Sequence, residues 1–340
     1  MGELSVTPTA LMDQFGRAHR DLRVSLTDRC SLRCAYCMPE DFADWTPGDH
    51  LLSVDEIVEV VSVAVSCGVR TIRLTGGEPL LNPCVVEIVR RIAGLSDAPE
   101  ISMTTNGLRL AQLARPLADA GLSRVNVSLD TLDRQRFLDI TKRDRLSAVI
   151  DGIAAAGAAG LHPVKVNAIL RRGVNDDEAV SLLRHALARG WRLRFIEQMP
   201  LDAGGLWSRR TMITADEIQR ALSREFLLTP VLPRGSMPAE EFYVDGGPQI
   251  VGVIASVTRP FCGSCDRLRL TADGQLRNCL FASQETDLRA TLRDTSLIEQ
   301  QRRRQIAALF RVSVDAKAIG HGINDPAFHQ PARPMSAIGG

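Results

Sequence analysis

The chain has 340 residues, of which 45% are hydrophobic and 24% charged, and its formal net charge is +1. A chain of this length and composition can bury a full core in one large domain plus a smaller one, or in two domains of ordinary size. The near-neutral charge argues against a protein that coats nucleic acid, and no apolar run reaches the roughly 18 residues of a membrane span. The N-terminal stretch MGELSVTPTALMDQFGRAHRD carries charges and no continuous apolar region, so it is not a secretory signal. We therefore expect a cytoplasmic protein with no nucleic-acid or membrane partner.

Short strand-like runs alternate with longer helical patterns through the first part of the chain. The predicted strands are Leu22–Leu26, Thr71–Thr75, Ile101–Thr104, Arg124–Leu129, Val164–Ile169 and Leu193–Glu197. The predicted helices are Ser53–Cys67, Pro83–Gly94, Leu108–Ala120, Leu146–Ala159 and Asp176–Ala188. Six β–α units in succession predict a parallel sheet with right-handed crossovers, which we interpret as an incomplete (β/α)6 TIM-like barrel of the α/β class.

Several predicted strands end in polar or glycine-rich sequence, namely TGGEP, TTNG, SLD and EQMP. In β/α barrels the chemistry lies at the C-terminal ends of the strands, so these tails mark the candidate site. The helices also carry local end signals. Ser53 followed by Glu56 predicts a capping box, and glycines at positions 68, 121, 160 and 190 follow helix patterns.

The β–α alternation stops near Pro200. Beyond it we predict a strand at Ile250–Val257 and helices at Gln284–Leu292 and Ser296–Phe310. The sequence therefore predicts three regions: a variable extension over residues 1–20, a partial barrel over residues 21–200, and a smaller C-terminal domain over residues 201–340 that closes the open side of the barrel.

Three cysteines, Cys30, Cys34 and Cys37, form C-x3-C-x2-C in the loop after the first predicted strand. Thiolates are soft anionic ligands, and three in one loop can wrap one metal centre while leaving a coordination position open. A structural zinc site or a set of unrelated buried cysteines is the alternative interpretation.

A second group, Cys262, Cys265 and Cys279, forms C-x2-C-x13-C, again with three ligands and no nearby fourth. A zinc ribbon, the alternative, would need a second C-x2-C pair that is missing here. The two remaining cysteines, Cys67 and Cys84, lie in or beside helix patterns, and we interpret them as packing residues.

An alternating segment, Asp266-Arg267-Leu268-Arg269-Leu270, lies between the cysteines of the second group. The alternation predicts a strand with both arginines on one face. Guanidinium groups match phosphate oxygens well, although two arginines on a strand, taken alone, more often face solvent. We interpret the arginines at 302–304 as an exposed helix face.

The first cysteine group, with Tyr36 before its last cysteine and Gly76-Gly77-Glu78-Pro79 after the second strand, resembles the radical S-adenosylmethionine superfamily. The resemblance implies a [4Fe–4S] cluster whose fourth iron is chelated by the methionine part of S-adenosylmethionine. Reduction then splits that cofactor into methionine and a 5′-deoxyadenosyl radical. Read from the residues, two glycines let the backbone approach closely, and Glu78 can accept a hydrogen bond from an ammonium group.

With the second cysteine group, the R-L-R segment and the terminal Gly339-Gly340, the chain from about Arg20 onward resembles the molybdenum cofactor biosynthesis protein A family of GTP 3′,8-cyclases. The resemblance implies two [4Fe–4S] clusters, one on each cysteine group. It implies that S-adenosylmethionine contacts Tyr36, Gly77, Glu78, Ser128 and Met199. It implies that GTP is surrounded by Arg23, Arg73, Thr104, Lys165, Arg267, Leu268 and Arg269. The catalytic set that it implies is Arg23, Arg267, Arg269, Gly339 and Gly340.

The reaction implied by the resemblance begins with removal of the ribose 3′ hydrogen of GTP. The sugar radical then attacks C8 of guanine, and reduction gives 3′,8-cyclo-7,8-dihydro-GTP, in the first step of molybdopterin biosynthesis. The resemblance also implies an external electron donor, transfer of the product to cyclic pyranopterin monophosphate synthase, and a homodimer. A glycine-ended terminus is by itself flexible, whereas the family resemblance implies that the tail reaches into the active-site cavity.

Two other functions compete with this one. The first is a radical S-adenosylmethionine enzyme that modifies a peptide or protein and carries an auxiliary cluster; it would not need so many basic residues aimed at one cavity. The second is a zinc-stabilised nucleic-acid-binding protein, against which the net charge of +1 and the aromatic content of 4% both argue.

Overall fold

The computed structural model describes residues 10–38, 42, 44–202, 205 and 207–339. Its first strands lie within one residue of the predicted bounds: β1 Asp21–Ser25, β2 Thr71–Thr75, β3 Glu100–Thr105, β4 Arg124–Ser128, β5 Lys165–Ile169 and β6 Arg192–Ile196. The predicted helices are present as α1 Val54–Ser66, α2 Val85–Ala93, α3 Leu110–Asp119, α5 Leu146–Ala158 and α6 Ala179–Ala188. The capping box of α1 is confirmed, and the four glycines that follow helices have positive φ. The predicted β/α fold is therefore confirmed.

One helix of this half, α4 Arg134–Thr141, was not predicted. It is short and mostly polar, and Asp133 caps its first turn by accepting a hydrogen bond from the Arg136 N–H at 2.8 Å. The described chain also contains three short 3-10 turns, η1 Gly48–His50, η2 Pro79–Leu81 and η3 Cys262–Ser264.

The C-terminal part adds strands to both ends of the same sheet. Its strands are β7 Leu228–Pro230, β8 Glu240–Val244, β9 Ile250–Ile254, β10 Arg267–Leu270, β11 Gln275–Arg277 and β12 Thr286–Asp287. Its helices are α7 Ala215–Leu222, α8 Arg289–Leu292, α9 Glu299–Asp315 and α10 Met335–Ile338. The sheet order is β12-β11-β10-β1-β2-β3-β4-β5-β6-β9-β8-β7, with β9 parallel to β6 and β10 parallel to β1. The chain beyond residue 200 thus continues the barrel sheet at both edges.

Three predictions for this part need correction. The predicted helix Gln284–Leu292 is helical only in α8, because Thr286–Asp287 instead pairs with β11 and satisfies its backbone groups there. The predicted strand Ile250–Val257 ends at Ile254. The helix predicted at Ser296–Phe310 starts and ends later, at Glu299–Asp315.

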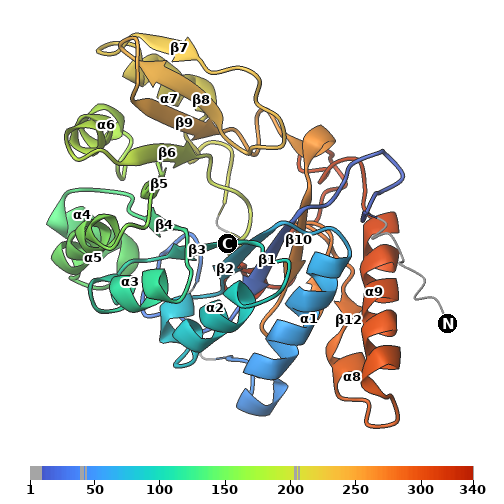
Figure 1. The fold of residues 1–340 in the computed structure, drawn as a ribbon. Coiled ribbons are helices and arrows are strands. Elements are labelled where there is room, and N and C mark those ends of the chain that lie inside the picture. Colours follow the sequence, from blue (N-terminus) through green and yellow to red (C-terminus); the bar gives the residue numbers. More distant parts are fainter. Residues whose placement is uncertain (1–9, 39–41, 43, 203–204, 206, 340) are drawn as a thin grey trace.

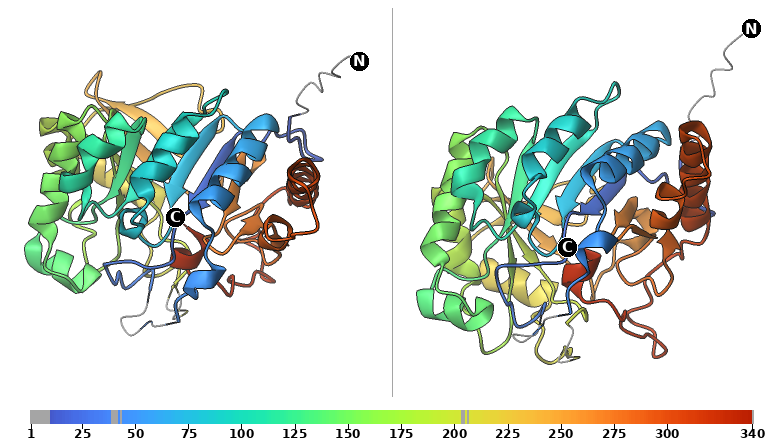
Figure 2. Two further views of the ribbon diagram at one scale, coloured as in Figure 1. Left: turned by 60° about the horizontal axis from the view of Figure 1, so that its bottom comes forward. Right: turned by 90° about the horizontal axis from the view of Figure 1, so that it is seen from below.

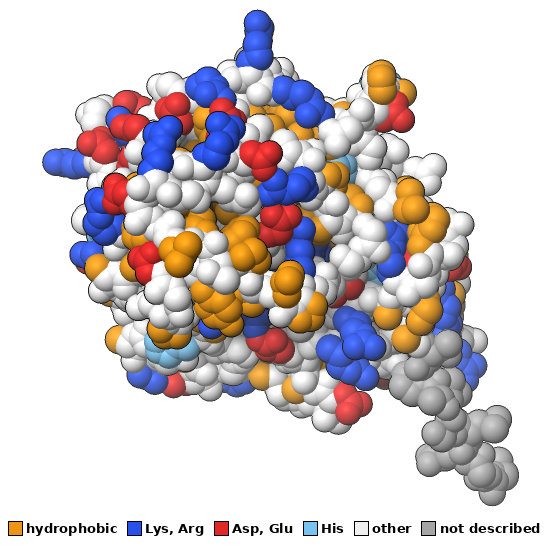
Figure 3. Space-filling model, turned by 90° about the horizontal axis from the view of Figure 1, so that it is seen from above, with side chains coloured by type: hydrophobic (Ala, Val, Ile, Leu, Met, Phe, Trp, Pro, Cys, Tyr) orange, Lys and Arg blue, Asp and Glu red, His pale blue; other side chains and the backbone are white. Residues whose placement is uncertain are grey.

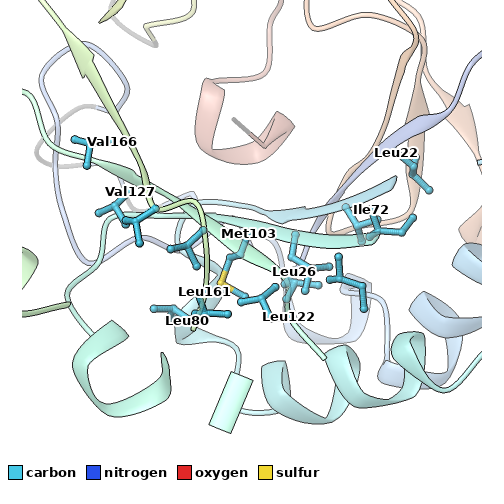
Figure 4. Close-up of a cluster of buried hydrophobic side chains, with 14 of the residues drawn as sticks. Leu22, Leu26, Ile72, Leu80, Met103, Leu122, Val127, Leu161 and Val166 are labelled. Carbon is cyan, nitrogen blue, oxygen red and sulfur yellow. The ribbon is translucent and has the colours of Figure 1, made fainter. Parts of the chain in front are cut away.

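Alternation along the parallel strands divides the sheet into an apolar convex face and a polar concave face. The helices α1 to α6 cover the convex side (Figures 1 and 2), where Leu22, Ile72, Met103 and Val127 form a fully buried core (Figure 4). Because side chains alternate, the residues next to them in sequence, such as Arg23 and Arg73, face the concave side. On the outer surface drawn in Figure 3, acidic and basic side chains are interspersed.

The last described residues lie inside the curve of the sheet (Figure 1). Helix α10 lies beside the C-terminal end of β1, where the Ser25 hydroxyl donates to the Ile338 carbonyl at 3.2 Å. Within the described residues, no helix has both the length and the apolar character that a membrane crossing needs.

Candidate active site

Two adjoining cavities lie on the concave face of the sheet. The first, of about 210 Å³, is lined by the first cysteine group, and the second, of about 160 Å³, by the second cysteine group. Five residues line both, namely Thr104, Asn167, Ile196, Met199 and Met335. The fold therefore brings two cysteine groups that are far apart in sequence to the two ends of one connected space.

The first cysteine loop is held by hydrogen bonds to α4, the helix that was not predicted from the sequence. The N–H groups of Arg33 and Ala35 donate to the carbonyls of Thr141 and Ile140 at the end of α4, at 2.9 and 3.1 Å. Within the loop, the Cys37 N–H donates to the Cys34 carbonyl at 2.8 Å. These bonds fix the loop so that all three thiols line the first cavity.

The two glycines of TGGEP are required by the packing of the chain against itself. A Cβ on Gly76 would lie closer than 3.0 Å to the Thr27 carbonyl, and one on Gly77 would meet the carbonyls of Asp28 and Arg29 equally closely. Gly76 also has a φ of +141°, which side chains disfavour. The β2 tail thus packs directly on the cysteine loop, and Gly77 lines the first cavity.

Glu78 lies behind the first cavity and does not line it. Its carboxylate accepts hydrogen bonds from the Thr105 hydroxyl at 2.7 Å and from the N–H groups of Asn106 and Leu80 at 2.6 and 3.0 Å. It is 1% exposed, and burial raises its pKa. The predicted contact between Glu78 and a ligand ammonium stays a prediction, and in this structure the carboxylate hydrogen-bonds to the protein. What the structure shows is a clamp between the ends of β2 and β3.

The other predicted S-adenosylmethionine contacts, Tyr36, Ser128 and Met199, all line the first cavity. The Tyr36 hydroxyl donates to the Asp130 carboxylate at 2.6 Å, and burial raises the pKa of Asp130 to about 6. Asn106 also lines this cavity, with its side-chain amide 3.8 Å from the Cys30 sulfur. Asp130 and Asn106 were not predicted, although SLD and TTNG carry them at strand ends.

The second cysteine group is assembled by a hairpin. Cys262 begins η3 and Cys265 follows it, and the antiparallel turn from β10 to β11 carries the chain back to Cys279, with Arg269 opposite Arg277. Arg17 braces the loop by donating to the Cys262 carbonyl at 2.7 Å. Residues 10–20, which we expected within a variable extension, therefore support this site.

Basic side chains crowd the second cavity. It is lined by five arginines: Arg23, Arg73, Arg267 and Arg269, which were predicted to surround GTP, and Arg194. Arg23 lies between Arg269 and Arg73 in register across three neighbouring strands. No Asp or Glu lines this cavity among the described residues. Burial and then neighbouring arginines lower the pKa of Arg23 well below its ordinary value and the pKa of Arg194 to about 9.

The predicted one-sided arrangement of Arg267 and Arg269 is confirmed, since Leu268 is fully buried in the core on the other face. The Leu268 side chain therefore does not line either cavity. Lys165 does not line them either; it lies near Arg194, and burial followed by that neighbouring charge lowers the pKa of Lys165 to about 8. Arg194 was not singled out from the sequence. The signal was present, because Arg194 lies between the buried residues Leu193 and Phe195, in the same alternating pattern that marked Arg267 and Arg269.

The tail reaches the wall of the cavities. Met335 lines both, and the Arg269 guanidinium donates to the Gly339 carbonyl. Gly339 has a φ of +88°, and a Cβ there would lie closer than 3.0 Å to the hydroxyls of Ser25 and Thr75. Only glycine fits this position. Gly340 lies outside the described residues.

Both cysteine groups have the chemistry that an iron–sulfur cluster needs. All six cysteines are free, and those of each group interact electrostatically with one another. Burial raises the pKa of Cys34 well above its ordinary value and that of Cys37 to about 12, so these thiols become anionic when a metal centre stabilises the thiolates. Among the described residues, no three His, Cys, Asp or Glu side chains meet the spacing of a single metal ion.

Comparisons with known proteins agree with this site. A family model described as the radical SAM superfamily matches residues 24–186, and one described as Molybdenum Cofactor Synthesis C matches residues 191–323. The GTP 3′,8-cyclase of Streptomyces coelicolor is 55% identical over 97% of this chain and 96% of its own length. GTP 3′,8-cyclase 2 of Mycobacterium tuberculosis is 54% identical over 98% of this chain and 94% of its own length.

Among solved structures, Streptococcus suis SuiB bound to S-adenosylmethionine is similar in fold, with a TM-score of 0.58 and 13% identity over 90% of this chain and 68% of that protein. The sequence relatives are far closer and cover nearly the whole chain. The chain therefore belongs to the radical SAM superfamily and, within it, to the GTP 3′,8-cyclase family.

Proposed function

We propose that this protein converts GTP to 3′,8-cyclo-7,8-dihydro-GTP, using S-adenosylmethionine and two [4Fe–4S] clusters. The observation that carries the proposal is the second cavity, in which five arginines face a cysteine triad with no carboxylate in the described lining. Buried like charges in register repel one another unless an anion neutralises them. A triphosphate supplies that anion, and charge-assisted hydrogen bonds hold it.

In the first cavity, Cys30, Cys34 and Cys37 would hold the cluster that binds S-adenosylmethionine. When bound and reduced, that cluster supplies the electron that cleaves the cofactor to a hydrogen-abstracting adenosyl radical. The protein's own residues do the rest: the β2 tail and Met199 shape the cavity, and the Tyr36–Asp130 pair fixes its far wall. Because the two cavities share lining residues, a ligand bound in one would lie next to a ligand bound in the other, and the packed surroundings would exclude water.

The second triad, Cys262, Cys265 and Cys279, would hold the other cluster at the guanine end of the nucleotide. Arg23, Arg73, Arg267 and Arg269 would then bind the phosphates, and the bond from Arg269 to Gly339 would keep the tail against the bound nucleotide. This assignment makes Arg269 a link between the substrate and the terminus. Lys165 does not line the cavity, but its positive charge near Arg194 would add to the attraction for the phosphates.

The remaining partners are part of the same proposal. An external reductant would supply electrons in the cytoplasm, cyclic pyranopterin monophosphate synthase would receive the product, and the enzyme would act as a homodimer. A peptide-modifying function is disfavoured because an enzyme acting on a peptide would not need five arginines aimed at one cavity.

The test is anaerobic incubation of the reduced enzyme with S-adenosylmethionine and a panel of nucleotides, following 5′-deoxyadenosine and the fate of each nucleotide. Cyclisation of GTP, with ATP and guanosine unchanged, would support the proposal. Cleavage of S-adenosylmethionine without turnover of any nucleotide would refute the substrate assignment. About eight iron and eight sulfide per chain would support two clusters, and a colourless zinc protein would exclude them.

Replacing Arg267 or Arg269 by alanine should weaken GTP binding more than guanosine binding. Each lost contact to a charged phosphate is worth about 1.5–3 kcal/mol, so the dissociation constant for GTP should rise about ten- to a hundredfold. Isothermal titration of both ligands measures the difference. Arg192→Ala, at an exposed position on β6, is the matched control and should leave both constants unchanged. Equal losses for GTP and guanosine would indicate a folding defect near Cys265.

Deleting Gly339 and Gly340 should leave both clusters and GTP binding nearly intact but reduce formation of the cyclised product. The reason is that the tail would no longer lie against the bound nucleotide, while Arg269 keeps its charge for the phosphates and the cysteine loops keep their contacts. The measurement is cyclised nucleotide per 5′-deoxyadenosine under identical reduction. Gly339→Val should give the same fall, because its side chain clashes with Ser25 and Thr75. An unchanged ratio in both variants would make the tail dispensable.

A further inference from the structure

Lys317 is a buried lysine next to the second cysteine triad. The chain has three lysines among its 41 basic residues, so lysine is a rare choice here. Lys317 follows α9, is 3% exposed, and its ammonium donates to the Arg267 carbonyl at 2.7 Å. The same ammonium lies 3.8 Å from the Cys265 sulfur. A buried lysine of this kind needs an anionic partner.

No carboxylate supplies that partner in the described part of the chain. The ion pairs found there do not include Lys317, and the groups whose negative charge would stabilise its ammonium are the thiolates of Cys265 and Cys279. The nearby Arg17 is already paired with Asp13 at 2.6 Å, and Arg267 adds a further positive charge. The charge of Lys317 is therefore balanced only when the cysteine triad is anionic.

Lys317 also lies on a different side of the triad from the arginine cluster. A third cavity, of about 240 Å³, is lined by Cys262, Cys265 and Cys279 together with Lys317. Lys317 does not line the second cavity, which holds the arginines. A substitution there removes charge from the triad without removing a group from the proposed nucleotide site.

We propose that Lys317 is a positioning residue that holds the Cys265 thiolate and raises the reduction potential of the second cluster. The proposal rests on the two-cluster assignment made above. A fixed positive charge stabilises the more negative, reduced state of a cluster, and a hydrogen bond to a ligand sulfur acts in the same direction. The reduced second cluster is thus easier to form beside Lys317 than it would be beside a neutral side chain.

The test is an anaerobic redox titration of Lys317→Met, monitored by EPR, with the first cluster as internal reference. At a fixed potential, the ratio of reduced to oxidised second cluster should fall about tenfold, which corresponds to about 59 mV for one electron. The first cluster and the dissociation constant of GTP should not change. Lys317→Arg keeps the charge and should restore the potential. Arg304→Met removes the same charge from an exposed position on α9 and should have no effect.

An unshifted second cluster in Lys317→Met, or an equal shift of both clusters, would overturn the proposal. If Lys317→Met loses the second cluster, the Lys317→Arg variant distinguishes a need for positive charge from a role in packing. Retention of the cluster in the arginine variant supports a need for charge, and loss in both variants assigns Lys317 to packing alone. Wild-type protein with about four iron per chain would instead refute the two-cluster assignment itself.

Discussion

Replacing Cys30 by alanine is expected to abolish cleavage of S-adenosylmethionine. Cys30, Cys34 and Cys37 are the three thiols that line the first cavity, and three thiolates are the minimum that leaves one iron of a [4Fe–4S] cluster open for the cofactor. With two thiolates, the remaining ligands cannot hold that cluster, so release of 5′-deoxyadenosine after chemical reduction should fall to background. The second cluster should stay visible by EPR, because its ligands lie in a separate loop and hairpin.

Cys84→Ala is the matched control for this variant. Cys84 is half-buried against the core, outside both cavities, so its loss should leave the rate of cleavage unchanged. Cleavage near the wild-type rate in Cys30→Ala would remove the catalytic assignment of the first triad. Cleavage lost equally in Cys84→Ala would point to a general effect of removing a thiol.

Much of the fold could be predicted because its signals are local. A buried parallel strand is a short apolar run, and a covering helix repeats its apolar positions, so β2 was predicted at its observed bounds and β1 within one residue. The same alternation placed Arg267 and Arg269 on one face, which the structure confirms. The cysteine spacing and the terminal glycines were visible without any fold.

Other features depend on contacts between distant segments, which local patterns do not carry. The residues around Thr286 have a helical pattern, but Thr286 pairs with Leu276 in the sheet instead. The helix α4 was not predicted because it is short and its sequence is mostly polar. Arg17, which donates to the Cys262 carbonyl, lies in the segment that we expected from the sequence to be a variable extension. The sequence alone could not distinguish a ligand contact of Glu78 from its hydrogen bonds to Thr105 and Asn106. Both roles need a carboxylate at the end of a strand.

Replacing Cys279 by alanine should separate the two clusters functionally. Cys279 follows β11 and completes the second triad, so the variant should lose that cluster and iron should fall from about eight to about four per chain. The first cluster should remain visible by EPR, and slow cleavage of S-adenosylmethionine should continue without a cyclised product. The reason is that the nucleotide loses its partner at the guanine end while the first cavity keeps its lining. The measurements are iron content, EPR and cyclised nucleotide per 5′-deoxyadenosine.

Cys30→Ala is the reciprocal control, because it should lose the first cluster and keep the second. The two variants together then distinguish two independent sites from one unstable fold: each should retain the cluster that the other loses. A Cys279→Ala protein that still makes the cyclised nucleotide would show that the second cluster is structural or absent. The arginine cavity would then need another explanation, since its charges converge on the space beside Cys279.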